Sequence, residues 1–199
     1  MRHLLVPLAV VALAVGCTPD VAPTSSPSVF VSPTVSSSPS VSPSPSPTAV
    51  ESFPPAPATE SAEQAAIRAA WMEYWRVYEK FAADPSLADW TETQYVTTEE
   101  EATLIIQALG ELRDNGWRSL GGRAFRDVVI AEDVPNQQEA DTAEVRYCLD
   151  RSGVTLVDAE TETAVIVDVP PTFLETATLR RGLDGKWRVA MIRNQPAAC

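Results

Sequence analysis

The chain has 199 residues, a formal net charge of −12 and 45% hydrophobic residues. This length fits one ordinary domain with additional segments rather than two large domains. The acidic balance argues against a nucleic-acid-binding protein, which needs a basic face for phosphates. A charged content of 21% excludes a chain that is mostly buried in a membrane.

Residues 1–16 have the pattern of a signal peptide. A short positive start, Met1 to His3, precedes the apolar run from Leu4 to Val15. That run is shorter than the twenty or so residues that are needed to cross a bilayer. A charged start followed by an apolar run of this length predicts export and cleavage.

The end of this segment resembles the lipobox of bacterial lipoproteins, because small residues directly precede Cys17. The resemblance implies that Cys17 becomes the first residue and carries fatty acyl chains. The protein would then be anchored to the outer face of the cytoplasmic membrane. The alternative is an ordinary signal peptide in which Cys17 has no special role.

Residues 17–59 are predicted to form a tether. Eleven of the seventeen prolines and twelve serines fall between residues 18 and 57. Proline prevents regular hydrogen bonding, and serine buries too little surface to offset chain entropy. We expect an extended, disordered linker, which either acts as a spacer alone or also carries O-linked sugars.

Residues 60–199 are predicted to form the folded domain, which begins with two helices. Ser61 and Gln64 form a capping-box pattern before a helix over 62–83. A short helical turn is expected over 85–90. Thr98 and Glu101 suggest a second capping box, before a helix over 99–113. The first helix carries an apolar stripe of Ile67, Trp71, Tyr74, Tyr78 and Phe81.

From Trp117 onward the hydrophobic period changes to two, which predicts strands. The strands expected are 117–120, 124–131, 143–149, 154–158, 163–169, 172–181 and 186–193. The fourth and fifth are apolar on both faces, so we expect them in the centre of a sheet. Two helices followed by an antiparallel meander indicate an α+β fold, with the helices packed on one face of a curved sheet.

This order of elements resembles the nuclear-transport-factor-2-like superfamily. The resemblance rests on the aromatic first helix, the curved strands and the hairpin Asp184–Val189. The whole chain is also similar to small actinobacterial lipoproteins, through the strand Tyr147–Asp150 and the terminal Cys199. The superfamily contains pocketed isomerases, dehydratases and cyclases as well as members that only bind or scaffold. The fold therefore leaves the function open.

The few cysteines and histidines limit the possible chemistry. The single histidine, His3, lies in the predicted signal peptide, so triads and Cys–His nucleophiles that use histidine are excluded after cleavage. Two cysteines in an exported domain usually pair, which predicts a disulfide between Cys148 and Cys199. A free thiol nucleophile is the alternative. No cofactor or metal site is predicted.

Carboxylates remain as candidate acids or bases. Asp127, Asp150 and Asp168 lie in predicted strands and could face a pocket. The acidic run from Asp158 to Glu162 suits either a solvated turn or a Ca²⁺ site, although it lacks the EF-hand pattern. Glu99 to Glu101 are assigned to capping.

The last hairpin predicts one further candidate site. Depending on the turn length, Arg181 would lie opposite Arg188 or Lys186. Like charges across a hairpin destabilise it, unless neighbouring carboxylates neutralise them or an anionic ligand or partner lies between them. Of the five tryptophans, we expect most in the core and one or two at a pocket mouth or dimer face.

Two functions remain in competition. The first is a non-enzymatic, membrane-anchored domain that binds a small ligand or an envelope partner, or scaffolds an envelope assembly. The second is an extracytoplasmic enzyme with a pocket, in which an Asp or Tyr acts as acid or base.

Overall fold

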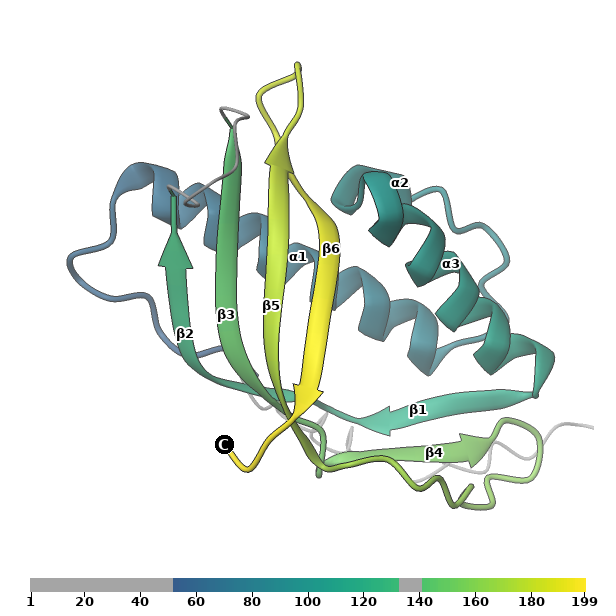
Figure 1. Ribbon diagram of the computed structural model, residues 1–199. Coiled ribbons are helices and arrows are strands. Elements are labelled where there is room, and N and C mark those ends of the chain that lie inside the picture. The colour runs from purple at the N-terminus through teal and green to yellow at the C-terminus, as the bar shows by residue number, and fades with distance from the viewer. Residues whose placement is uncertain (1–51, 133–140) are drawn as a thin grey trace, which may run out of the picture. The chain divides into compact units, whose positions relative to one another are not determined.

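The computed structural model describes residues 52–132 and 141–199. The predicted signal peptide, Cys17 and the tether up to residue 51 lie outside the described residues. The described part has an α+β fold, as predicted, with the order α1–α2–α3 followed by six strands (Figure 1). No helix among the described residues is long and apolar enough to cross a bilayer.

Helix α1 spans Ala62–Ala83 and begins at the predicted capping box. The Ser61 side chain accepts a hydrogen bond from the Gln64 backbone, and the Gln64 side chain accepts one from the Ser61 backbone. Its buried face includes Ile67, Trp71 and Phe81. The predicted stripe therefore faces the core.

Helix α2 is a single turn, Thr93–Val96, and not the turn expected over 85–90. Asp84 explains the difference, because its side chain accepts hydrogen bonds from the backbone and hydroxyl of Ser86. These bonds hold the chain in a local turn after α1. Helix α3 spans Glu99–Asp114 and ends at Asn115–Gly116, as predicted.

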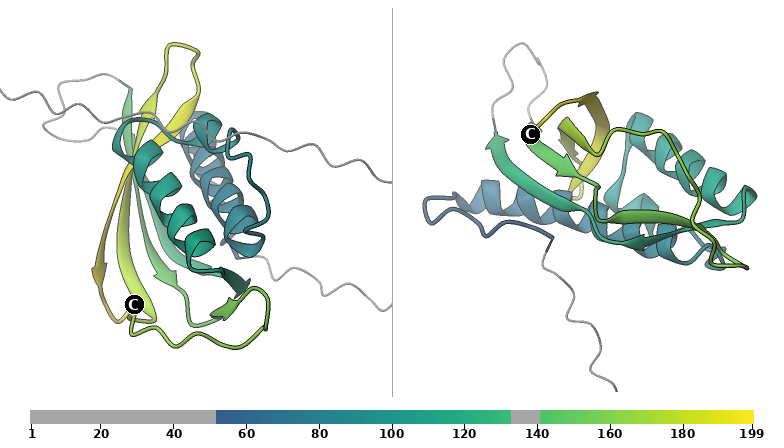
Figure 2. Two further views of the ribbon diagram at one scale, coloured as in Figure 1. Left: turned by 90° about the vertical axis from the view of Figure 1, so that its right-hand side faces the viewer. Right: turned by 90° about the horizontal axis from the view of Figure 1, so that it is seen from below.

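The strands form two antiparallel sheets. Strands β2 (Ala124–Ala131), β3 (Thr142–Asp150), β5 (Thr172–Arg181) and β6 (Trp187–Pro196) form a four-stranded sheet in the order β2-β3-β5-β6. Strands β1 (Trp117–Gly121) and β4 (Val154–Asp158) form a separate pair. Figure 2 shows α1 and α3 on the same side of the four-stranded sheet.

The predicted strand over 163–169 is absent. Only Ala164 forms an isolated bridge, with Val157, and Ile166 is 98% exposed. The other strand expected in the centre of a sheet, Val154–Asp158, lies in the two-stranded sheet, where β1 is its only partner strand. Apolar, β-branched residues favour a strand only where a partner strand is available. The four-stranded sheet passes directly from β3 to β5 and offers this segment no partner.

Strand β1 pairs with β4, and strand β2 pairs with β3. The four strands therefore form one long hairpin that bends in the middle. The bend falls between the pairs Gly121–Val154 and Ala124–Asp150. Gly121 has φ +79°, and a Cβ there would lie 1.9 Å from the Gly153 carbonyl oxygen. Only glycine allows both that conformation and that close approach.

The predicted disulfide between Cys148 and Cys199 is present. It attaches the C-terminus to β3. The N-terminal end of the described segment is also attached to the domain. Phe53 stacks on Phe125 with ring centroids 4.7 Å apart, and the Phe125 amide donates a hydrogen bond to the Ser52 carbonyl oxygen. Packing therefore begins before residue 60.

Candidate functional site

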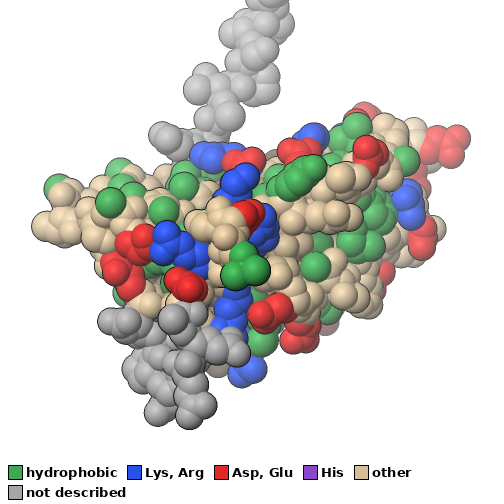
Figure 3. Space-filling view, turned by 90° about the horizontal axis from the view of Figure 1, so that it is seen from above, with side chains coloured by type: hydrophobic (Ala, Val, Ile, Leu, Met, Phe, Trp, Pro, Cys, Tyr) green, Lys and Arg blue, Asp and Glu red, His purple; other side chains and the backbone are tan. Residues whose placement is uncertain are grey.

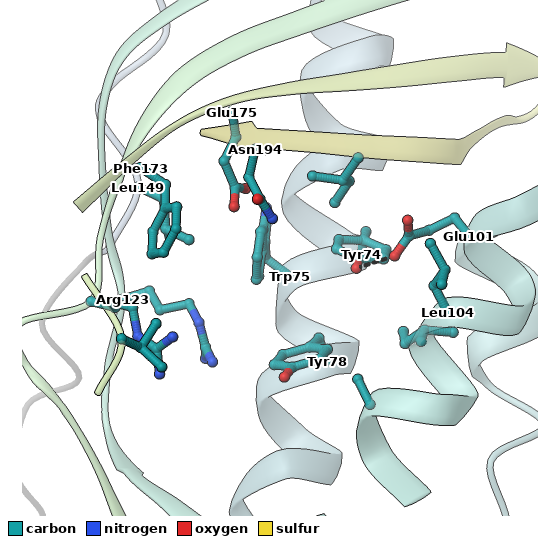
Figure 4. Close-up of a pocket in the computed structure, with 15 residues that line it drawn as sticks. Tyr74, Trp75, Tyr78, Glu101, Leu104, Arg123, Leu149, Phe173, Glu175 and Asn194 are labelled. Atoms are coloured by element: carbon teal, nitrogen blue, oxygen red, sulfur yellow. Dashed lines mark hydrogen bonds between the residues drawn. The ribbon is translucent and has the colours of Figure 1, made fainter. Parts of the chain in front are cut away.

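A cavity of about 450 Å³ lies between the helices and the sheet (Figure 4). Helix α1 contributes Tyr74, Trp75 and Tyr78 to its wall, and α3 contributes Glu101, Leu104, Ile105 and Ala108. Residues of the hairpin bend and of the strands β5 and β6 line the other sides. The volume is within the range that holds a small organic ligand.

The cavity is lined by both apolar and polar side chains. Most of its lining is apolar or aromatic, but five polar side chains converge on it. This combination is typical of ligand sites, where apolar surface supplies affinity and a few polar groups fix orientation. The five polar side chains other than tyrosine are Glu101, Arg123, Arg151, Glu175 and Asn194.

A row of polar residues crosses the sheet toward the cavity. Tyr147 in β3 lies opposite Glu175 in β5, and Glu175 lies opposite Asn194 in β6. Directly opposite residues of antiparallel strands point to the same face. Glu175 and Asn194 line the cavity, while Tyr147 is fully buried behind it and packs against Trp71 and Trp75.

Glu175 is 4% exposed, and its Oε2 atom has no hydrogen-bond partner among the described residues. Burial raises the pKa of Glu175 from 4.5 to about 7, although the Tyr147 hydroxyl and the Arg123 charge oppose the rise. A buried carboxyl whose pKa lies near neutrality can hold or release a proton at physiological pH.

Glu101 forms the second buried carboxyl of the cavity, with 4% exposure. The Tyr74 hydroxyl donates a hydrogen bond of 2.6 Å to Glu101 Oε1. Burial raises the pKa of Glu101, while this hydrogen bond and one from the Ile192 backbone oppose the rise. Burial also raises the pKa of Tyr74 well above its usual value, and the nearby Glu101 charge adds to that effect.

The capping role that the sequence predicted for Glu101 is wrong. Thr98 makes no capping hydrogen bond with its side chain, and Glu101 faces the cavity instead. Its place on the buried stripe was visible in the sequence, because Glu101, Ile105 and Leu109 recur every four residues.

Glu175 was not singled out from the sequence at all. Alternation along β5 places it on the same face as Phe173, Ala177 and Leu179. A charged residue at a core-facing position of a strand is the signal that could have identified it.

The three aspartates predicted to face a pocket do not line this cavity. Asp127 is exposed, at a β-bulge with φ +53°. Asp150 accepts hydrogen bonds from the Ser152 backbone and from Arg126. Asp168 is exposed in the loop after β4, which the sequence had assigned to a strand.

The acidic run after β4 forms a turn. Asp158 Oδ1 accepts hydrogen bonds from the backbone amides of Glu160 and Thr161. Within the described ranges, no group of three or more His, Cys, Asp or Glu residues could hold a metal ion.

The last hairpin has a different register from either one predicted. Arg180 lies opposite Arg188, and Arg181 lies opposite Trp187, because a bulge shifts the pairing after Thr178. Acidic side chains lie beside both predicted site residues. Arg188 forms an ion pair of 2.6 Å with Asp184, and Arg181 lies 3.3 Å from Glu63. Figure 3 shows basic and acidic side chains interleaved at this end of the domain.

Two of the five tryptophans are buried, and the other three are partly exposed. Trp71 and Trp75 are buried, and Trp75 lines the cavity. Trp90 packs against the guanidinium of Arg113, and Trp187 donates a hydrogen bond of 2.8 Å to Glu63.

Several solved structures resemble the chain at low identity. The intermembrane space region of the chloroplast protein ARC6 is 11% identical, with a TM-score of 0.46, over 69% of this chain and 98% of that one. A ketosteroid isomerase-like protein from Erwinia carotovora atroseptica is 17% identical, with a TM-score of 0.44, over 70% and 100% of the two chains. A cystatin-like domain of unknown function from Nostoc punctiforme is 12% identical, with a TM-score of 0.37, over 71% and 81%.

No family model matches the chain, and no curated protein matches its sequence. The function therefore has to be inferred from the residues of the cavity.

Proposed function

We propose that the domain binds a small, largely apolar ligand in the cavity between α1, α3 and the sheet. One observation carries this proposal: about 450 Å³ of space is lined by aromatic and aliphatic side chains on which a few polar groups converge.

Buried polar atoms beside the cavity support this proposal. Glu175 Oε2 is desolvated and has no hydrogen-bond partner among the described residues. A buried acceptor without a partner costs about 1–3 kcal/mol. A ligand that donates a hydrogen bond to Glu175 would recover part of that cost.

The test is the binding of N-phenyl-1-naphthylamine, an uncharged fluorophore that brightens in apolar sites. The purified full chain should bind it, and Ala108→Trp should abolish the signal by filling the cavity from α3. Thr103→Trp, at an exposed position on the same helix outside the cavity wall, is the matched control and should bind normally. Equal binding by both variants would contradict the proposal.

A second candidate function is acid–base catalysis on the bound ligand. The observation that favours it is the burial of Glu175 on the cavity wall, which raises its pKa to about 7. In that case the base is a glutamate and not one of the predicted aspartates. The chain should then catalyse deuterium exchange from D₂O into the carbon next to the carbonyl of a small ketone. Glu175→Gln should abolish that exchange, and exchange at the uncatalysed rate across a panel of ketones would exclude this function.

We further propose that the domain is held at the outer face of the cytoplasmic membrane by lipid on Cys17. Support comes from the charged start, the short apolar run and the small residues before Cys17. In cells given an alkyne fatty acid, the chain should be labelled and should sediment with membranes. Cys17→Ala should lose both properties, whereas an unlabelled wild-type chain would overturn the proposal.

A further inference from the structure

Two arginines lie at the bend of the long hairpin, one from each strand. Arg123 comes directly before the pair Ala124–Asp150, and Arg151 comes directly after it. Both side chains line the cavity. The bend therefore brings the two guanidinium groups close enough for the charge of Arg123 to act on Arg151.

Arg123 is held in place by its surroundings. Its backbone amide donates a hydrogen bond of 3.3 Å to Glu79 Oε1, and its guanidinium lies 3.5 Å from the same oxygen. The guanidinium also lies over the rings of Tyr78, at 4.9 Å, and Trp75, at 5.6 Å. Its position is thus fixed without a ligand.

Arg151 is positioned only through its backbone. Its amide donates a hydrogen bond of 2.8 Å to the Pro171 carbonyl, and its carbonyl accepts one of 2.9 Å from Val154. Its side chain is half-buried, and within residues 52–132 and 141–199 no carboxylate lies within 4 Å of it. Burial lowers the pKa of Arg151 and the charge of Arg123 lowers it further, while the nearby Tyr78 and Glu175 oppose the shift.

Two guanidinium groups that repel each other in a half-buried site are unfavourable unless anions offset their charge. Glu79 pairs with Arg123, and Glu175, whose pKa is about 7, is ionised only in part at neutral pH. The planar fork of a guanidinium matches a carboxylate or a related acidic group, and such charge-assisted hydrogen bonds are strong. The cavity wall also includes the apolar side chains Leu149 and Phe173 and the carboxyl of Glu175, whose charge interacts with both arginines.

We propose that Arg123 and Arg151 bind the acidic head group of an amphipathic organic anion whose apolar body occupies the rest of the cavity. This inference rests on the proposed ligand-binding function and narrows its ligand class. The charge comes from the bend, and the apolar contacts come from α1, α3 and the sheet.

The test compares two probes with the same ring system. One is the uncharged N-phenyl-1-naphthylamine, and the other is its sulfonated analogue 8-anilino-1-naphthalenesulfonate. Both are titrated into the purified full chain, into Arg151→Gln and into Arg146→Gln. Arg146 lies in β3 and its side chain is 68% exposed, so this control removes the same charge away from the cavity.

We expect the sulfonated probe to bind Arg151→Gln about tenfold or more weakly than the wild-type chain. The uncharged probe should bind both equally, and Arg146→Gln should behave as wild type. Unchanged binding of the sulfonated probe to Arg151→Gln would overturn the anion site and leave the proposed function intact. Equally weakened binding of the sulfonated probe to Arg146→Gln would also overturn the anion site, because it would show that the net charge of the chain determines the affinity. If neither probe binds the wild-type chain, the proposed function itself fails.

Discussion

Glu175 should make the stability of the domain depend on pH in a specific direction. Its pKa is about 7 in the folded state, against 4.5 for an unperturbed glutamate. Between these values the folded state holds a proton that the unfolded state has released. The contribution of Glu175 to the free energy of unfolding should therefore be highest below about pH 4.5 and fall as the pH rises through about 7.

The size of the effect follows from the same two values. At about 1.4 kcal/mol for each pKa unit, ionising Glu175 in the folded state costs about 3 kcal/mol. The groups that act on its charge are the Tyr147 hydroxyl from β3, Arg123 and Arg151 from the bend, and Glu101 from α3. Burial also raises the pKa of Glu101, so part of the pH dependence of stability should remain when Glu175 is replaced.

The assay is urea unfolding followed by tryptophan fluorescence from pH 5 to pH 8. Glu175→Gln keeps the shape of the side chain and removes its titration. The stability of the variant relative to wild type should increase across this range by up to about 3 kcal/mol. Glu160→Gln, on the exposed turn after β4, should leave the pH dependence unchanged. Parallel curves for wild type and Glu175→Gln would refute the reasoning.

Three further predictions concern the framework around the cavity. Cys199→Ser should lower the free energy of unfolding by about 4 kcal/mol, because the disulfide closes a loop of 51 residues; a melting temperature insensitive to this change would contradict it. Tyr74→Phe should cost about 1–3 kcal/mol in urea unfolding, because buried Glu101 loses the hydrogen bond from the Tyr74 hydroxyl and keeps only the one from the Ile192 backbone; an unchanged midpoint would show that the bond is not needed. Gly121→Ala should destabilise the domain more than Gly116→Ala in thermal unfolding. Both glycines have positive φ, but only at Gly121 would an added Cβ clash with a backbone oxygen. Equal destabilisation by the two variants would show that the whole cost comes from the positive φ.

The two long helices, α1 and α3, could be predicted because their signals are local. Capping by Ser61 and the regular spacing of apolar residues in α1 depend on neighbours in the sequence. The disulfide followed from cysteine number and predicted export. By contrast, the strand expected around Ile166 failed because a strand needs a partner, and sequence periodicity does not supply one.

The site was less predictable than the fold. Glu101 looked like a capping residue because its spacing from Thr98 suits both a cap and the buried stripe. Arg123 and Arg151 are 28 positions apart, and only the bend at Gly121 brings both of them to the cavity wall. The predicted pair Arg181 and Arg188 failed to lie opposite each other because one bulge shifted the register.

The most direct test of ligand binding is an NMR titration of the tryptophan indole N–H signals of the full chain with N-phenyl-1-naphthylamine. Trp75 lines the cavity, whereas Trp90 and Trp187 contact Arg113 and Glu63 elsewhere. Binding in the cavity should shift the Trp75 signal and leave those of Trp90 and Trp187 in place. A Trp75 signal that stays fixed while the probe binds would place the ligand outside this cavity and contradict the proposed function.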